Sequence, residues 1–173
     1  MIGMDFIVDA GEYEEDMNVR LSPPDLAKFL SRKKAEDVAG RYKNAIIIAA
    51  DTFIVFKRNV MGKPRDEEEA KTMLGKLSGK THSVITGFTV IDTETGKRLS
   101  RAVETRVSFK RLSAKEIDAY VRSKEPLDKA GAYAIQGLGS VIVRKVEGDY
   151  FNVIGLPLSA LVEGLKRFGI PVL

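Results

Sequence analysis

An unbroken apolar run, Ala45-Ile-Ile-Ile-Ala-Ala50, constrains the fold of this chain more than any other segment. A strand that alternates apolar and polar residues can leave one face in water, but a strand with no polar position must be covered on both faces. We therefore predict an α/β fold, in which a mixed, twisted sheet is flanked by helices in a single domain over residues 1–173.

Helix signals are clear at several points. Serine, proline and an acid in Ser22-Pro23-Pro24-Asp25 predict a helix start, and that helix is expected to end near Gly40. Ser113-Ala-Lys-Glu116 is a capping box that predicts a helix through Tyr120. The remaining expectations are an acid-led helix from Asp66 with Ala70, Met73, Leu74 and Leu77 buried, a last helix from about 157 to 168, and strands near 53–56, 82–91, 98–110 and 140–146.

Composition excludes several function classes. The 173 residues include no cysteine, so neither thiol catalysis nor a disulfide is available. The net charge is +4, but basic and acidic residues are interspersed, which does not favour nucleic-acid binding. No apolar run approaches the roughly 20 residues needed to span a membrane, and no signal-peptide pattern opens the chain. We expect a cytoplasmic protein.

Asp51 is the first candidate for chemistry, because it follows the apolar run directly. An aspartate there lies either at the carboxyl end of a strand or inside a core. A carboxylate at a strand end can bind a divalent cation or accept a proton from water. The alternative, a turn-forming aspartate at a strand end, is about equally consistent with the sequence. Asp is rarely buried without a partner, which favours a functional site slightly.

Weaker candidates accompany it. Lys63, between Gly62 and Pro64, could present a point charge to a phosphate, although such a turn is more often simply solvated. Lys34 on the first helix and Glu14 in an acidic run could also contribute to a site, but such residues are more often simply solvated. His82, the only histidine, is predicted to be structural. Gln136 is the only glutamine, and its amide could read the edge of a ligand. Carboxylates, lysines and one amide suit metal-assisted attack of water on a phosphate.

Longer motifs carry a family resemblance. They are Ala50-Asp51-Thr52, Gly62-Lys63-Pro64, Leu77-Ser-Gly-Lys-Thr-His-Ser-Val84 with Thr86-Gly87, Glu125-Pro-Leu-Asp-Lys-Ala-Gly-Ala-Tyr-Ala-Ile-Gln-Gly137 and Gly148-Asp-Tyr-Phe-Asn-Val-Ile-Gly-Leu-Pro157. In this order the chain resembles the Maf family. The resemblance implies an inosine-triphosphatase-like fold, a divalent metal (Mg or Mn), a homodimer, and hydrolysis of the α–β phosphate link of a nucleoside triphosphate.

The resemblance also implies roles for individual residues. Asp51 matches the proton acceptor, and Asp51 with Glu14 would hold the metal. Thr52 and Gln136 match positions that distinguish a subgroup acting on dTTP and UTP from one acting on 7-methyl-GTP. The other polar residues expected to line the substrate site are Lys34, Lys63 and Asp128. The alternative function is a non-catalytic nucleotide-binding regulator, since the family was also associated with inhibition of septum formation.

One departure from the family pattern concerns the start of the chain. The family begins with a strand and a Ser-x-Ser-Pro-Arg-Arg loop whose arginines lie near the phosphates, and nothing in this sequence matches it. Because those donors would bind phosphate oxygens in pairs, we expect this chain to turn over less substrate than one extended upstream. Equal turnover by the two chains would contradict that expectation.

Overall fold

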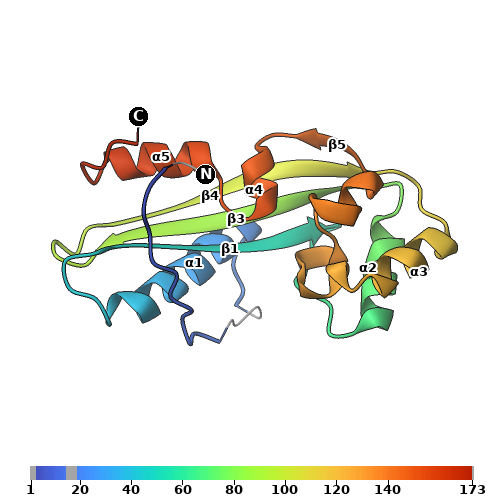
Figure 1. The fold of residues 1–173 in the computed structure, drawn as a ribbon, viewed down its shortest axis with the longest axis horizontal. Helices are drawn as coiled ribbons and strands as arrows, with labels where there is room; N and C mark the ends of the chain where they lie inside the picture. The colour runs from blue at the N-terminus through green and yellow to red at the C-terminus, as the bar shows by residue number, and fades with distance from the viewer. Residues whose placement is uncertain (1–2, 15–18, 173) are drawn as a thin grey trace. The chain divides into compact units, whose positions relative to one another are not determined.

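The computed structural model describes residues 3–14 and 19–172. In these residues none of the helices has the length and apolar character needed to cross a bilayer. The elements (Figure 1) follow in the order α1 (Pro23–Ala39), β1 (Ile46–Phe56), β2 (Asn59–Met61), α2 (Glu67–Leu77), β3 (Thr81–Asp92), β4 (Arg98–Phe109), α3 (Ala114–Arg122), three 3₁₀ helices η1 (Glu125–Asp128), η2 (Ala130–Ala132) and η3 (Gly137–Ile142), β5 (Val143–Glu147), α4 (Tyr150–Ile154) and α5 (Leu158–Lys166).

The strands form one five-stranded sheet in the order β2-β1-β3-β4-β5. It is antiparallel, whereas we expected a mixed sheet. The reason lies in the connections, because β1–β2 and β3–β4 are joined by short turns, and strands joined by such turns must run antiparallel. The α/β class and the flanking helices are confirmed.

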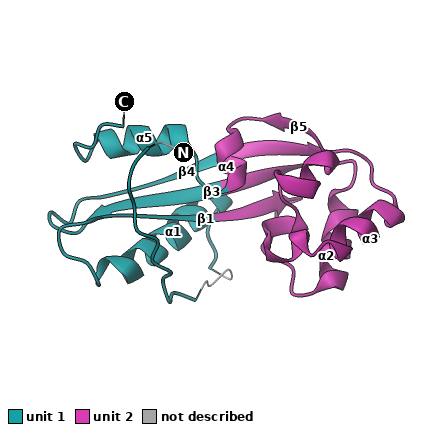
Figure 2. Cartoon of the chain, in the orientation of Figure 1, with its two compact units in different colours: residues 1–51, 86–103, 155–173 teal, residues 52–85, 104–154 magenta. Residues whose placement is uncertain are grey.

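The chain divides into two compact units, each built from segments that are distant in sequence. Figure 2 shows unit 1, made of residues 1–51, 86–103 and 155–173, and unit 2, made of residues 52–85 and 104–154. The prediction of a single domain over residues 1–173 stays a prediction.

In unit 1 the sheet is covered on both faces, as the apolar run predicted. Successive side chains of a strand point to opposite faces, so neighbouring positions of β3 meet different helices (Figure 1). Ile91 packs with α1 and Ile47, whereas Phe88 and Val90 pack with α5. The residues of the two clusters are Ala35, Val38, Ile47 and Ile91 on one face, and Phe88, Val90, Leu161 and Leu165 on the other. The run 45–50 contributes to both, although Ile48 is 40% exposed.

Gly87 sets how closely α1 approaches β3. A Cβ atom at this position would lie 2.1 Å from the carbonyl oxygen of Ala27, so only a hydrogen fits. Thr89 lies two residues further along β3, and its hydroxyl forms a buried hydrogen bond of 3.0 Å with the hydroxyl of Ser31 on α1. The backbone of α1 therefore lies directly on the strand with a fixed register.

Unit 2 has its own core around α2. The predicted stripe of Ala70, Met73, Leu74 and Leu77 is buried there, as expected. The capping box of α3 is also confirmed, with Ser113 and Glu116 bonding each other's backbone N–H groups. The same core takes in Tyr120 and Tyr133.

Three expectations about the strands and helices were wrong. The apolar pieces 45–50 and 53–56 belong to one continuous strand, β1, and not to two. The strand expected at 140–146 begins only at Val143, because 137–142 forms η3. The short helix α4 was not anticipated, and it is capped by the Asp149 carboxylate, which accepts a hydrogen bond from the N–H of Phe151 at 2.8 Å.

His82 is structural, as predicted. Its ring is 3% exposed and lies edge-on to the rings of Phe109 and Tyr133, with centroids 5.0 and 5.3 Å away. Nε2 shares a hydrogen bond of 2.9 Å with the Tyr133 hydroxyl, while Nδ1 has no partner among the described residues. Burial lowers the pKa of His82 to about 4, because the charged ring would lose its hydration.

We expect this histidine to make stability fall as the pH falls. The unfolded chain takes up a proton near pH 6.5, whereas the folded chain takes it up only near pH 4. The contribution of His82 to the free energy of unfolding is fully present above about pH 6.5. It decreases by about 3 kcal/mol as the pH falls towards 4. Urea unfolding of wild type and His82→Gln between pH 4.5 and 7.5 measures it. The difference in unfolding free energy between the two should shrink with acidification, and a constant difference would refute this assignment.

Candidate functional site

Asp51 forms an ion pair with Lys34 inside unit 1. The Lys34 Nζ atom, from α1, lies 2.6 Å from Oδ1 of Asp51 on β1. Their side chains are 28% and 6% exposed. Asp51 is in the middle of the eleven-residue strand β1 and is buried, so of the two predicted places, a strand end or a core, it occupies the core. It points to the face of β1 that α1 covers, as Ile47 does four residues earlier.

This pair explains how a carboxylate can stay in a buried strand. Burying an ionised carboxylate is costly unless it is paired and hydrogen-bonded. The ammonium of Lys34 offsets that cost and fixes one carboxylate oxygen in place. Lys34 is in turn placed by the contact of α1 with β3, because it follows Ser31 by about one helical turn. A carboxylate held in this way can accept a proton from water or bind a cation.

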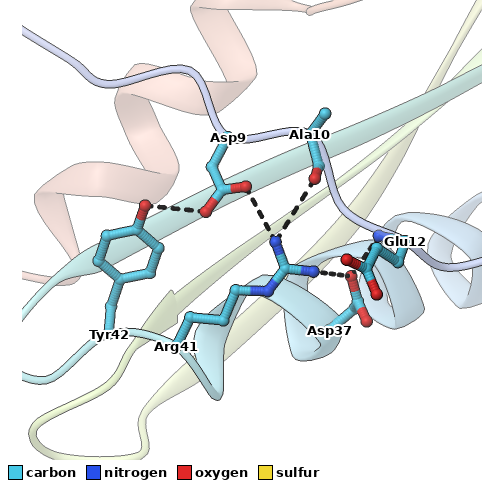
Figure 3. A network of polar contacts seen from close by, with 6 residues as sticks. All are labelled: Asp9, Ala10, Glu12, Asp37, Arg41 and Tyr42. Carbon is cyan, nitrogen blue, oxygen red and sulfur yellow. Dashed lines mark hydrogen bonds and ion pairs between the residues drawn. The ribbon is translucent and has the colours of Figure 1, made fainter.

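Glu14 lies on the segment that precedes α1. That segment is tied to the end of α1 by polar contacts (Figure 3): Arg41 pairs with Asp9 at 3.0 Å, Tyr42 donates to Asp9 at 2.8 Å, and Asp37 accepts from the N–H of Glu12 at 2.7 Å. Glu14 itself is exposed. The contacts hold the segment at Asp9 and Glu12, and the assignment of Glu14 as a metal ligand stays a prediction.

In unit 2 the structure brings two predicted loops together. The N–H of Gly131 donates to the carbonyl of Gly62 at 2.8 Å, which joins the loop carrying Lys63 to the loop carrying Asp128. Lys129 binds both carboxylate oxygens of Asp128, at 2.8 and 2.7 Å. This hydrogen bond, with a smaller contribution from the charge of Lys63, lowers the pKa of Asp128.

Two lysines lie within two residues of the Gly131–Gly62 hydrogen bond. Lys63 and Asp128 are exposed and Lys129 is half-buried, so two ammonium groups accompany one carboxylate. An exposed lysine that is close to backbone N–H groups is a usual partner for phosphate. Lys129 was not predicted from sequence as a site residue, although it lies within the motif from Glu125 to Gly137.

Thr52 and Gln136 are placed differently from each other. Thr52 follows Asp51 in β1 and is half-buried. Gln136 is exposed and immediately precedes η3, in a loop with extended backbone at that residue. The loop around Gln136 is held by Glu125, whose role was missed from sequence. The available signal was the pair of glycines at 137 and 139, since glycine often marks a close approach.

The residues fit a metal that is shared with a substrate. Within residues 3–14 and 19–172, no three or more His, Asp or Glu side chains cluster as a ready cage for a metal ion. Mg²⁺ in phosphate-processing sites is usually held by one or two carboxylates together with phosphate oxygens and water. The single fixed carboxylate of Asp51 matches that kind of site.

Comparison with known proteins places the chain in a family. The family model described as Maf-like protein matches residues 1–168. The chain belongs to the Maf family. A relative from Methanosarcina barkeri (strain Fusaro / DSM 804), named dTTP/UTP pyrophosphatase, is 45% identical over 172 residues, which is 99% of this chain and 87% of the relative. Proteins of the same name from Alkaliphilus oremlandii (strain OhILAs) and Bacillus cereus (strain AH820) are 49% and 45% identical, over 96% and 99% of this chain and 86% and 89% of their own lengths.

In this Maf-family chain, mutations of Lys34 and Asp51 should have coupled effects on the free energy of unfolding. We expect Lys34→Met to cost about 2 kcal/mol of unfolding free energy, because it leaves a buried carboxylate without that ammonium. In a double-mutant cycle with Asp51→Asn, the coupling should exceed about 1 kcal/mol. Denaturant unfolding of the four proteins measures it.

Lys33→Met is the matched control. The neighbouring lysine pairs with Glu36 at 3.5 Å, and both side chains are more exposed, at 42% and 31%. That pair should be worth less than about 1 kcal/mol. Equal costs for the two lysine variants, or a coupling near zero, would show that the Lys34–Asp51 pair does not hold the carboxylate.

Proposed function

We propose that this chain is a nucleoside triphosphate pyrophosphatase acting on dTTP and UTP. The observation that carries the proposal is the fixed carboxylate of Asp51, which pairs with Lys34 at 2.6 Å. This carboxylate belongs to a chain that is similar, over nearly the whole of its own length, to proteins named dTTP/UTP pyrophosphatase. A homodimer in the cytoplasm remains part of the proposal.

The reaction divides the triphosphate at its α–β link. Water attacks one phosphorus of this anhydride, a new P–O bond forms, and the bond to the bridging oxygen breaks to give the monophosphate and pyrophosphate. Asp51 accepts the proton that the water loses. Lys34 holds Asp51 in place, and Lys63 offsets negative charge on the phosphates, assisted by Lys129 beside Asp128.

Asp51 and Glu14 are the carboxylates that we assign to hold a divalent cation, Mg²⁺ or Mn²⁺, which would further neutralise the charge of the triphosphate oxygens. Asp51 suits this role because burial and ion pairing fix its position. Glu14 suits it because its segment is anchored to α1 through Asp9 and Asp37 (Figure 3).

Selection of the base falls to Gln136 and Thr52 in this proposal. A side-chain amide both donates and accepts hydrogen bonds, which matches the mixed donor and acceptor edge of thymine or uracil. The exposed position of Gln136 leaves its amide available to a ligand. The Thr52 hydroxyl is a second group that can both donate and accept a hydrogen bond.

The test is release of pyrophosphate from a panel of nucleotides with Mg²⁺ or Mn²⁺. We expect release from dTTP and UTP, and Asp51→Asn should lower kcat by about 10²- to 10⁴-fold, because the amide cannot take the proton. Asp118→Asn is the control, since Asp118 is a surface acid that pairs with Lys71 at 3.3 Å.

The outcomes are distinct when nucleotide binding is measured alongside by calorimetry. Full turnover by Asp51→Asn would rule out the catalytic assignment. Binding of dTTP and UTP by the wild type without any release of pyrophosphate would favour the non-catalytic regulator.

A further inference from the structure

The carboxylate of Glu125 is the centre of a hydrogen-bond cluster in unit 2. Its Oε1 atom accepts from the Tyr120 hydroxyl at 2.8 Å and from the N–H of Gly139 at 2.8 Å. Its Oε2 atom accepts from the N–H of Leu138 at 2.9 Å. Both oxygens are therefore occupied, and two of the three donors are backbone groups of the loop that carries Gln136.

Tyr120 holds the other side of the same loop. Its side chain comes from α3 and is 7% exposed. The tyrosine oxygen donates to Glu125 and accepts from the N–H of Ala134 at 3.0 Å. Gln136 is thus bracketed: the backbone is held two residues before it by Tyr120, and two and three residues after it by Glu125.

Two glycines fit the loop around this cluster. Gly137 has φ of +67°, and a Cβ atom there would lie 2.4 Å from Oε2 of Glu125. A Cβ atom at Gly139 would lie 2.1 Å from the carbonyl oxygen of Ala134 and 2.5 Å from the Tyr120 hydroxyl. Neither position has room for a side chain, so the loop can close on the carboxylate only with glycine.

The cluster depends on an ionised carboxylate. Burial raises the pKa of Glu125, but the N–H groups of Leu138 and Gly139 outweigh burial and hold the pKa below its ordinary value. Burial also raises the pKa of Tyr120 well above its ordinary value. Tyr120 therefore stays protonated and donates a hydrogen bond to Glu125. A glutamine at position 125 would keep the shape but turn an NH₂ group towards one of the backbone donors.

We propose that Glu125 is a positioning residue for base selection, which acts through the backbone of Gln136 and does not touch the nucleotide. This inference rests on the proposed function, in which the Gln136 amide reads the pyrimidine. It assigns to Glu125 and Tyr120 the task of holding that amide in one place. The consequence is that loss of the carboxylate should weaken selection of the base more than binding of the triphosphate.

The experiment measures affinity for two non-hydrolysable nucleotides by calorimetry, α,β-imido dUTP and α,β-imido dGTP, with Mg²⁺. Selectivity is the ratio of the two Kd values. We expect wild type to prefer the uracil analogue, and Gln136→Ala to lower this preference by about tenfold, as loss of base-edge hydrogen bonds would. Glu125→Gln should lower the preference by at least about threefold while the affinity for the guanine analogue stays within about twofold.

Glu116→Gln is the matched control. Glu116 is also a carboxylate that accepts a backbone N–H, from Ser113 at 2.8 Å, but it caps the start of α3. It should lower Tm and leave the selectivity unchanged. If Glu125→Gln does not fold, Tyr120→Phe carries the same test, because it keeps the carboxylate but removes the group that binds Ala134.

The possible results separate this inference from the proposed function. A wild-type preference that is reduced in Glu125→Gln and kept in Glu116→Gln supports the positioning role. A wild-type preference that survives in Glu125→Gln, with only a lower Tm, overturns the positioning role and leaves the proposed function standing. A wild type that has no preference for the uracil analogue overturns both.

Discussion

The approach of α1 to β3 at Gly87 is the contact on which the arrangement of unit 1 depends. With a Cβ position only 2.1 Å from the Ala27 carbonyl, any other residue would push the helix away from the strand. The short distance lets Ser31 reach Thr89, and it places Lys34 one turn later beside Asp51. A wider gap would leave the Asp51 carboxylate buried without that ammonium, which is among the costliest changes that a core can undergo.

Local signals were sufficient for much of the fold. The stripe on α2 and the capping box of α3 depend on residues within one or two turns of each other, so sequence alone predicts them. Asp51 was different. The sequence left open whether this aspartate ends a strand or lies inside a core, and a lysine that is 17 residues away in sequence allows the strand to continue through it. The interaction that decides the position of Asp51 is not local, and the sequence pattern did not reveal it.

The segment 137–142 also depends on contacts that are distant in sequence, but here they prevent a strand. Residues 140–142 were expected to begin a strand, yet they belong to η3. Glu125 takes the N–H groups of Leu138 and Gly139 that a neighbouring strand would otherwise bind, and Gly137 adopts a φ of +67° that a strand does not use. The candidate residues Asp51 and Gln136 were both found from sequence, but the groups that hold them, apart from Lys34, were found only in the structure.

The chain uses two ways to fix a polar group, and the difference follows from their surroundings. Asp51 lies on a strand within a packed core, where the ion pair with Lys34 holds one of its oxygens. Gln136 is exposed on a loop, where backbone and side chain are otherwise free to move. A hydrogen bond to a base contributes only about 1 kcal/mol net, which is less than the cost of ordering one loose residue. An amide on a mobile loop would therefore lose its discrimination to entropy. Under the proposed function, the ordering would have to be supplied before the nucleotide arrives, and the hydrogen bonds of Glu125 and Tyr120 around this loop are placed to supply it.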